Sequence, residues 1–241
     1  MPKSRHYRRW ITDHDLVSFY VTCDQTDLMI LAKSDLSILA EDLAKVHHNT
    51  VIDYIRNNPE FEHSLSPLEV DTSAPPIIRE MYEASQKANV GPMAAVAGAI
   101  AEYIGKDLLN STSEVIVENG GDIFLQSPHK RTVAIYAGNS PLSKRIGITL
   151  PGSPSPKGIC TSSGTFGHAL SFGNADAALA IASSAALADA AATAIGNAVK
   201  TADDINTGIE IARSIPGIDG TIIIVEKNIG VWGDIELTPL D

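Results

Sequence analysis

The sequence has 241 residues, 44% of them hydrophobic, so the chain can bury a full core and is not a disordered protein. Its formal net charge of -11 and pI near 5.0 argue against a general binder of nucleic acids or anionic membranes, because affinity for phosphates depends on clustered Lys and Arg. The two cysteines, Cys23 and Cys160, provide neither a disulfide framework nor a zinc-ligand pattern.

The amino terminus lacks the apolar stretch of a signal peptide, and no run of about 18 apolar residues occurs in the sequence. We therefore expect a cytoplasmic protein that has neither a membrane nor a nucleic acid as its partner.

Residues 15–32 contain two apolar, β-branched or aromatic runs around residues 24–27, which predicts a β-hairpin. Ser34 is predicted to cap a helix, since apolar residues then recur at helical spacing up to Asn57-Asn58-Pro59. Residues 59–76 contain four prolines and scattered acids, and we expect a loop there.

Helical periodicity returns in residues 76–109, with a break at 89–92. The second half of this region is rich in Ala and Gly. Such small residues let another backbone or a flat ligand come close, although tight packing of the helix against a sheet is the ordinary explanation.

After Asn110 the periodicity is that of short strands separated by turn residues, which favours an α+β fold with antiparallel sheets over βαβ repetition. An alanine-rich helix at 184–200, a second helix at 202–215 and a hairpin at 220–237 complete the chain. Gly-Asp-Ile at 233–235 repeats residues 121–123, a short echo that leaves an internal duplication open.

The first candidate site is Glu118-Asn119-Gly120-Gly121-Asp122, within an otherwise apolar strand. Two glycines in a strand mark a bulge or a close approach of something else to the backbone. Exposed N–H groups there could bind a phosphate or the edge of a flat ring, and Asp122 could bind a hydroxyl or a metal-bound water. The alternative is a bulge or turn with a solvated acid.

The second candidate is the pair Asp189 and Thr193, which are four residues apart and therefore about 40° apart around a helix, with Asn197 continuing the stripe. Carboxylate and hydroxyl oxygens, together with water and a substrate phosphate, commonly hold Mg²⁺. The alternative is that Asp189 favours the helix dipole and that Thr193 bonds to its own helix.

The third candidate is the segment from Cys160 to His168. Its hydroxyls and glycine N–H groups could cradle an anion, and His168 could exchange protons near neutral pH. Cys160 could act as a nucleophile if a nearby positive charge lowered its pKa, whereas a buried inert thiol is the ordinary alternative.

In this order the three segments resemble the ApbE superfamily, the FAD:protein FMN transferases. The resemblance covers residues 91–200, and the helix start matches the family's A-D-A-x-A-T-A pattern. The matching residues are Asn119-Gly120-Gly121-Asp122-Ile123, Thr161-Ser162-Ser163-Gly164 with His168 downstream, and Ala188-Asp189-Ala190-Ala191-Ala192-Thr193-Ala194.

The resemblance implies a T-fold-like α+β architecture in which residues 1–241 form a single domain of two packed lobes. It further implies an FAD cleft in which Mg²⁺, held by Asp189 and Thr193, bridges the pyrophosphate. His168 and Asp189 would be the catalytic residues. The cofactor site would be lined by Asn119, Gly120, Gly121, Asp122, Thr161, Ser162, Ser163 and Gly164.

The implied reaction cleaves FAD, giving FMN to a Thr or Ser of an acceptor protein or to water while AMP leaves.

The chain departs from the family pattern at two places. After its histidine, Ala169-Leu170-Ser171-Phe172-Gly173 replaces Asp-Pro-x-Thr-Gly, and Glu102-Tyr103-Ile104 stands where the family has a Lys-Gly pair. With no lipid-attachment cysteine near its amino terminus, the chain resembles the cytoplasmic branch. A non-catalytic flavin- or nucleotide-binding protein, a thiol or sulfur-relay role for Cys160, and a homodimer all remain open.

Overall fold

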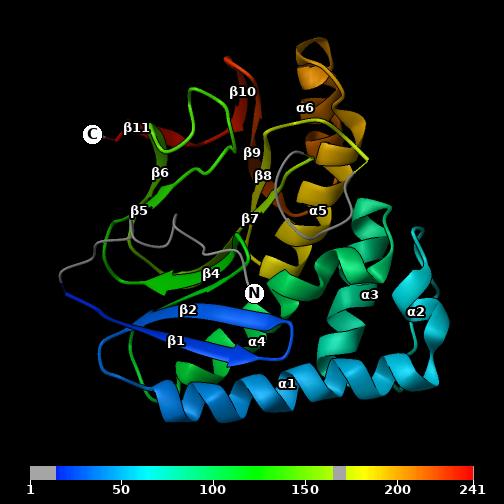
Figure 1. Ribbon diagram of the computed structural model, residues 1–241, viewed down its shortest axis with the longest axis vertical. Helices are drawn as coiled ribbons and strands as arrows, with labels where there is room; N and C mark the ends of the chain where they lie inside the picture. The colour runs from blue at the N-terminus through cyan, green and yellow to red at the C-terminus, as the bar shows by residue number, and fades with distance from the viewer. Residues whose placement is uncertain (1–14, 165–171, 241) are drawn as a thin grey trace.

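A computed structural model describes residues 15–164 and 172–240 (Figure 1). Its strands form an eight-stranded and a three-stranded sheet, and every strand pairing described is antiparallel. The α+β prediction is therefore confirmed. The large sheet has the order β1 (Val17–Cys23), β2 (Thr26–Ala32), β3 (Val115–Asn119), β4 (Asp122–Ser127), β7 (Ser153–Ser162), β8 (Ala177–Ala182), β9 (Ile218–Val225) and β10 (Asn228–Gly233). The small sheet has the order β11 (Glu236–Pro239), β6 (Ile146–Leu150) and β5 (Arg131–Ala134).

The helices lie on one face of the large sheet and the small sheet lies on the other (Figure 1). Two apolar cores result, because successive residues of each strand point to opposite faces. Short 3₁₀ turns at Pro92–Ala95 and Ala202–Asp204 precede two of the helices. The helices are α1 (Ser37–Asn57), α2 (Pro59–His63), α3 (Pro76–Ala88), α4 (Val96–Leu108), α5 (Ala185–Ala198) and α6 (Ile205–Ser214).

The same order of elements occurs twice in the large sheet. The hairpin β1–β2, helices α1 to α4 and the hairpin β3–β4 form one half, while β7–β8, α5, α6 and β9–β10 form the other, and β4 pairs with β7. The Gly-Asp-Ile echo does not mark this repetition. Gly121 lies in the β3–β4 turn, whereas Gly233 ends β10, and the equivalent β9–β10 turn consists of Glu226 and Lys227.

Two local predictions were wrong. Ser34 does not cap a helix, because α1 begins at Ser37, whose N–H is accepted by Asp35 Oδ1 at 2.9 Å. The expected loop at 59–76 includes the short helix α2, which is too brief to show a periodicity. Pro59 suits its first position, where no N–H bond is needed, and the buried Phe61 anchors it by packing edge-on against Tyr54 and Tyr82.

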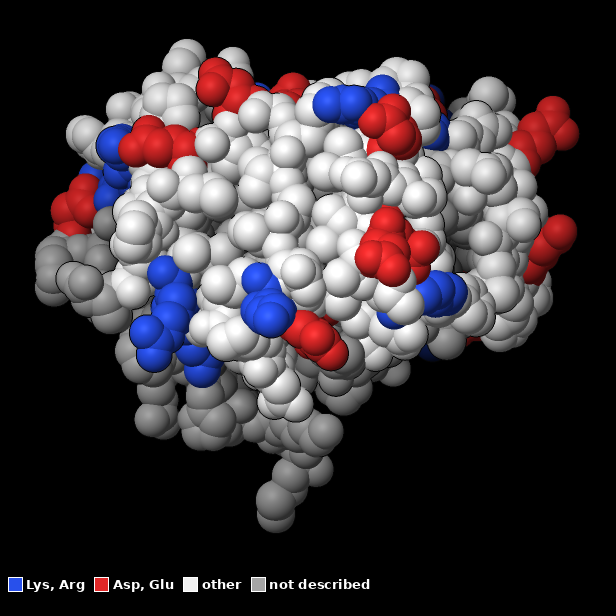
Figure 2. Space-filling model, turned by 90° about the horizontal axis from the view of Figure 1, so that it is seen from above, with Lys and Arg blue, Asp and Glu red and all other residues white. Residues whose placement is uncertain are grey.

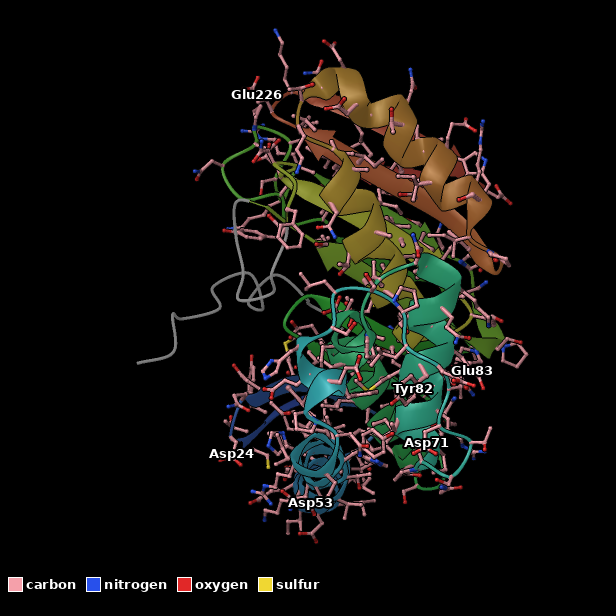
Figure 3. The ribbon with its side chains drawn as sticks, turned by 90° about the vertical axis from the view of Figure 1, so that its right-hand side faces the viewer. Asp24, Asp53, Asp71, Tyr82, Glu83 and Glu226 are labelled. Carbon is pink, nitrogen blue, oxygen red and sulfur yellow. The ribbon has the colours of Figure 1, made fainter. Side chains whose placement is uncertain are left out.

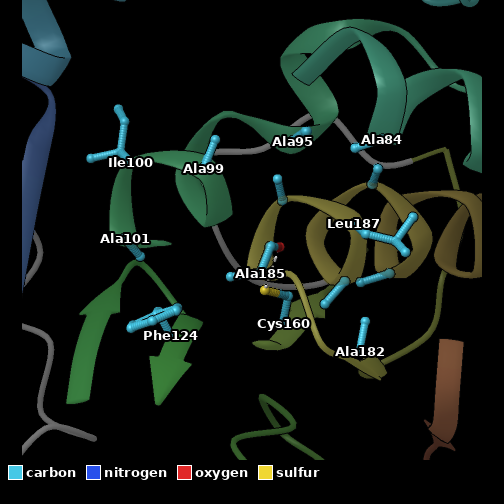
Figure 4. Packing of buried hydrophobic residues seen from close by; sticks show 14 of the residues in the cluster. Ala84, Ala95, Ala99, Ile100, Ala101, Phe124, Cys160, Ala182, Ala185 and Leu187 are labelled. Atoms are coloured by element: carbon cyan, nitrogen blue, oxygen red, sulfur yellow. Dashed lines mark hydrogen bonds between the residues drawn. The ribbon is translucent and has the colours of Figure 1, made fainter. Parts of the chain in front are cut away.

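The small residues of α4 serve close packing. A Cβ added to Gly98 would lie 2.2 Å from the carbonyl oxygen of Ala185 in α5, and one added to Gly105 would lie 2.2 Å from Phe124 Cδ1 in β4. Figure 4 shows the interlocking alanines of α4 and α5 above the sheet. The structure thus supports the ordinary explanation of the Ala- and Gly-rich stretch: its small residues let α4 pack tightly on the sheet and on a second helix, α5.

The surface carries mixed charge on the face seen in Figure 2. Lys and Arg are interspersed with Asp and Glu over this face, with mostly uncharged residues between them. Within the described residues of this face, no broad basic area is present. None of the helices described is both long and apolar enough to span a bilayer.

Candidate functional site

The two glycines of the first candidate segment form a hairpin turn and not a bulge within one strand. Both have positive φ, 71° at Gly120 and 113° at Gly121, which type I′ hairpin turns require at both central residues. Glu118 Oε1 accepts the N–H of Gly121 at 2.8 Å and so braces the turn. Asp122 is not a solvated acid: its side chain is buried, and its Oδ1 accepts the N–H of Thr161 at 3.2 Å, which ties β4 to the end of β7.

Strand alternation decides which predicted residues face the helices. Phe124 and Cys160 pack in the core beneath the helices, so Asp122 and Ser162, two residues away along their strands, point to the same side. Asn119 also lies there, and its Nδ2 donates to the carbonyl of Ala97 at 3.1 Å.

Thr161 faces the opposite side of the sheet from Cys160 and contributes its backbone N–H to the bond with Asp122. Ser163 and Gly164 follow the end of β7. The structure thus brings Asn119, Asp122 and Ser162 together beneath the helices and separates the Thr161 side chain from them.

Asp189 reaches from α5 to the amino-terminal end of α4. Its Oδ2 accepts the N–H of Gly98 at 2.9 Å. Burial and then the charge of Asp122 raise the pKa of Asp189 well above its ordinary value, while the N–H groups of Gly98 and Ala97 act in the opposite direction. The half-buried Asp189 of α5 therefore lies close enough to the buried Asp122 of β4 for their charges to oppose each other, and we call the two residues the carboxylate pair.

The polar stripe of α5 is confirmed as a structural feature. Asp189, Thr193 and Asn197 are half-buried, whereas most of the remaining helix is fully buried. Asn197 Oδ1 accepts the N–H of Phe172 at 2.8 Å. A Cβ on the adjacent Gly196 would lie 3.3 Å from Ser162 Oγ, so the carboxyl-terminal end of the stripe lies beside Ser162.

Helices α4 and α5 cap each other, a feature that sequence reasoning missed. The buried Glu102 of α4 accepts the N–H of Ala185 at 2.6 Å, the Ser184 hydroxyl at 2.9 Å and the N–H of Ala186 at 3.2 Å. Lys106 Nζ pairs with the other Glu102 oxygen at 2.6 Å. An isolated glutamate in an apolar, alanine-rich helix was the available signal, because a buried carboxylate needs partners.

The site fits Mg²⁺ by its chemistry. A magnesium ion prefers oxygen ligands, and Asp189 and Thr193 supply a carboxylate and a hydroxyl on successive turns. Burial and then the charge of Asp122 oppose the ionisation of Asp189, and a divalent cation beside the pair would offset the repulsion between the two carboxylates.

Cys160 has the environment of an inert thiol. Its side chain is completely buried, and Sγ donates to the carbonyl of Ala185 at 3.3 Å (Figure 4). Burial, followed by the charges of Asp122 and Asp189, raises its pKa well above the ordinary value, the reverse of what a reactive thiolate requires. The thiol or sulfur-relay role therefore has no support. His168 lies outside the described residues.

A cluster of Asp15, Glu114 and His129 has ligand atoms within 4.8 Å of one another but is an ion-pair network. Arg131 Nη1 lies 2.8 Å from Asp15 Oδ1, and Lys33 Nζ lies 3.0 Å from carboxylate oxygens of both Asp15 and Glu114. These two cations already balance the two carboxylates.

A cavity of about 490 Å³ lies beside α2 and α3, away from the predicted residues. Tyr82 on its wall contacts Tyr54, hydroxyl to hydroxyl at 3.0 Å, and Tyr54 donates to Asp71 at 3.0 Å. Figure 3 labels Tyr82 and Asp71. The cavity is lined by Asn58, Pro59, Glu60, Phe61, Leu68, Glu69 and Tyr82.

Comparison with known proteins identifies the family that this chain matches. The family model described as AbpE bacteria matches residues 8–215. A UPF0280 protein of Methanocaldococcus jannaschii is 43% identical over 194 residues, covering 78% of this chain and 79% of its own length. A UPF0280 protein of Methanococcus maripaludis is 48% identical over 187 residues, with 76% of each chain covered.

Solved structures share the fold. The flavin transferase ApbE from Vibrio cholerae superposes with a TM-score of 0.58 at 12% identity, covering 90% of this chain and 96% of that one. The ApbE protein of Thermotoga maritima gives a TM-score of 0.55 at 13% identity over 89% of this chain and 96% of its own. The chain therefore belongs to the AbpE bacteria family and, with it, to the ApbE-like superfamily.

Proposed function

We propose that this protein binds FAD together with Mg²⁺ and cleaves the FAD pyrophosphate, passing FMN to a Thr or Ser hydroxyl of an acceptor protein or to water. One observation carries the proposal: the Asp189 carboxylate, held by the N–H of Gly98 at 2.9 Å, lies within reach of the charge of the buried Asp122, with Thr193 on the next turn of α5. The flavin transferases that share the fold support the choice of substrate.

Each residue of the pair is held by backbone donors. The N–H groups of Ala97 and Gly98 orient Asp189, and the N–H of Thr161 orients Asp122. In this proposal Asp189 and Thr193 hold the cation, and Asn119, the Gly120-Gly121 turn and Ser162 line the nucleotide site. Bound Mg²⁺ would neutralise charge on the pyrophosphate oxygens.

In the proposed reaction the phosphoryl group of FMN moves from the bridging oxygen of FAD to an oxygen of the acceptor. The acceptor oxygen forms a bond to the phosphorus on the flavin side, the bond from that phosphorus to the bridging oxygen breaks, and AMP leaves with the bridging oxygen. The acceptor's proton passes to a base, a role that the family resemblance gives to His168. The proposal includes a cytoplasmic location, a single domain over residues 1–241 and assembly as a homodimer.

The test is to incubate the protein with FAD and Mg²⁺, with and without Ser- or Thr-containing acceptor protein, and to measure AMP by chromatography. We expect AMP from the wild type, none after chelation of the metal, and strongly reduced amounts from Asp189→Asn and Thr193→Val. Asp53→Asn, an exposed acid of α1 paired with Arg56, is the matched control and should behave as the wild type. Absence of AMP from the wild type with every acceptor, or unchanged rates in Asp189→Asn, would refute the enzymatic proposal.

A second candidate is a flavin- or nucleotide-binding protein without turnover. It is favoured by the bond from Gly98 to Asp189, which gives that residue a structural role independent of catalysis, and by the missing Asp-Pro-x-Thr-Gly segment. Tight FAD binding without AMP would support this candidate, whereas a wild type whose melting temperature responds to no nucleotide would exclude it.

A further inference from the structure

We propose that Phe172 is the stacking platform for one planar ring of the nucleotide bound at the Asp189 site, an inference that rests on the proposed function. The ligand chemistry is a heteroaromatic ring attached through a sugar or sugar alcohol to a phosphate. Both adenine and the flavin ring of FAD meet this description, and the experiment below distinguishes them.

Phe172 is exposed although its backbone is firmly attached to α5. Its side chain is 51% exposed, while its N–H donates to Asn197 Oδ1 at 2.8 Å. The next residue packs too closely to carry a side chain: a Cβ on Gly173 would lie 1.7 Å from the carbonyl oxygen of Gly196. An exposed aromatic side chain on an anchored backbone is the arrangement that ring stacking needs, because the surface is available and little backbone freedom is lost on binding.

A second contact continues this attachment. A Cβ on Gly164 would lie 2.0 Å from the carbonyl oxygen of Gly173, and the N–H of Gly164 donates to the carbonyl of Ala175 at 3.0 Å. The end of β7, the residues beside Phe172 and the end of α5 are therefore packed on one another. These contacts fix the backbone at Phe172 relative to the polar stripe of α5.

The spacing along α5 suits a nucleotide. Asn197, which holds Phe172, lies one turn beyond Thr193 and two turns beyond Asp189, about 6 and 12 Å along the helix axis at 1.5 Å per residue. In a nucleotide the phosphate and the ring are separated by the length of the intervening sugar. A pyrophosphate at Asp189 and Thr193 would therefore place a ring at the level of Phe172.

The experiment measures binding and not turnover. FAD and ADP are each titrated with wild type, Phe172→Ala and Phe172→Trp in the presence of Mg²⁺, following flavin fluorescence for FAD and heat for both. Leu65→Ala is the matched control, because Leu65 is 61% exposed and lies in the segment after α2. All variants change exposed side chains, and equal melting temperatures without ligand will show that they fold.

We expect Phe172→Ala to weaken FAD binding about tenfold, within the range of roughly 5- to 150-fold found for the loss of one base–aromatic stack. Phe172→Trp should retain the wild-type affinity and Leu65→Ala should not change it. An equal loss for ADP assigns adenine to Phe172, and a loss for FAD alone assigns the flavin ring.

The two proposals fail differently. If the wild type binds FAD and Phe172→Ala binds both nucleotides within twofold of it, the stacking role is wrong and the proposed function stands. A tenfold loss in Leu65→Ala would also overturn the stacking role, because the effect would then not be local. If the wild type binds neither FAD nor ADP with Mg²⁺, the proposed function fails and the platform fails with it.

Discussion

At the scale of single residues, Asp189 combines two requirements that oppose each other. Its bond from the N–H of Gly98 stabilises the amino-terminal end of α4, where a negative charge is favoured by the helix dipole. Its burial beside Asp122 disfavours that same charge. The cation that we propose at this place would offset the repulsion between Asp189 and Asp122.

Replacement of Asp189 separates the two roles. Asp189→Asn keeps an oxygen for the Gly98 N–H and removes the repulsion from Asp122, so without metal it should melt at the wild-type temperature or above it. Asp189→Ala loses the cap and should lose about 1 kcal/mol of unfolding free energy. Calorimetric melting in the absence of divalent metal checks this, and an Asn variant as unstable as the Ala variant would contradict it.

Glu114 predicts how stability depends on pH. Burial alone would raise its pKa, but hydrogen bonds from Ser127, Lys33 and Arg131 outweigh burial and hold the pKa below the ordinary 4.5. Since the folded pKa is lower than the unfolded one, the unfolded chain binds more protons between the two values. The stability that Glu114 contributes is therefore complete above about pH 4.5 and is lost as the pH falls through the folded pKa.

Glu114→Gln should lower the unfolding free energy by about 3 kcal/mol at neutral pH, because it removes the buried carboxylate that pairs with the buried Arg131 and leaves the more exposed Asp15 to balance that charge. The difference from wild type should shrink as the solution is acidified. Urea unfolding across this pH range measures both effects. The exposed Glu210→Gln is the control, and a difference that stays constant with pH would refute the assignment.

At the scale of elements, the mutual capping of α4 and α5 explains how the site is held. Asp189 supports α4 and Glu102 supports α5, so each helix supplies an acceptor for the unpaired N–H groups of the other. The close approach at Gly98 brings the two ends together. The cation site that we propose thus lies on a pair of helices whose relative position is set by hydrogen bonds as well as by apolar packing.

Glu102→Ala should cost about 3 kcal/mol or more, because the N–H groups of Ala185 and Ala186 and the Ser184 hydroxyl lose an acceptor in a buried place. Glu102→Gln retains one oxygen acceptor and should cost less. Glu41→Ala, on the exposed face of α1, should change stability little. Denaturant unfolding of the four proteins gives the order, and equal costs for Gln and Ala at position 102 would contradict the capping role.

At the scale of the whole molecule, local sequence patterns predicted most helices and strands, because hairpins and amphipathic helices have patterns that can be recognised within a few residues. The polar stripe of α5 was predictable for the same reason. The pairing of Asp122 with Asp189 and the capping by Glu102 were not, since they join segments that are distant in sequence and depend on the order of strands in the sheet. The family resemblance implied that the segments of Asp122 and Asp189 belong to one site, which the spacing of residues alone did not indicate.

The repeated hairpin–helices–hairpin order also explains where the site lies. Asp122 belongs to the first half and Asp189 to the second, and the contact of β4 with β7 brings the halves together at this point. A site built across the two halves requires the complete sheet.

The central claim is that Asp189 and Thr193 hold a cation through which FAD binds. Titration calorimetry of FAD into the metal-free protein, with and without added Mg²⁺, tests it most directly when wild type and Asp189→Asn are compared. We predict Mg²⁺-dependent FAD binding by the wild type and its loss in Asp189→Asn, which remains folded. FAD binding by the wild type that is indifferent to Mg²⁺, or unchanged Mg²⁺-dependent binding by Asp189→Asn, would contradict the claim.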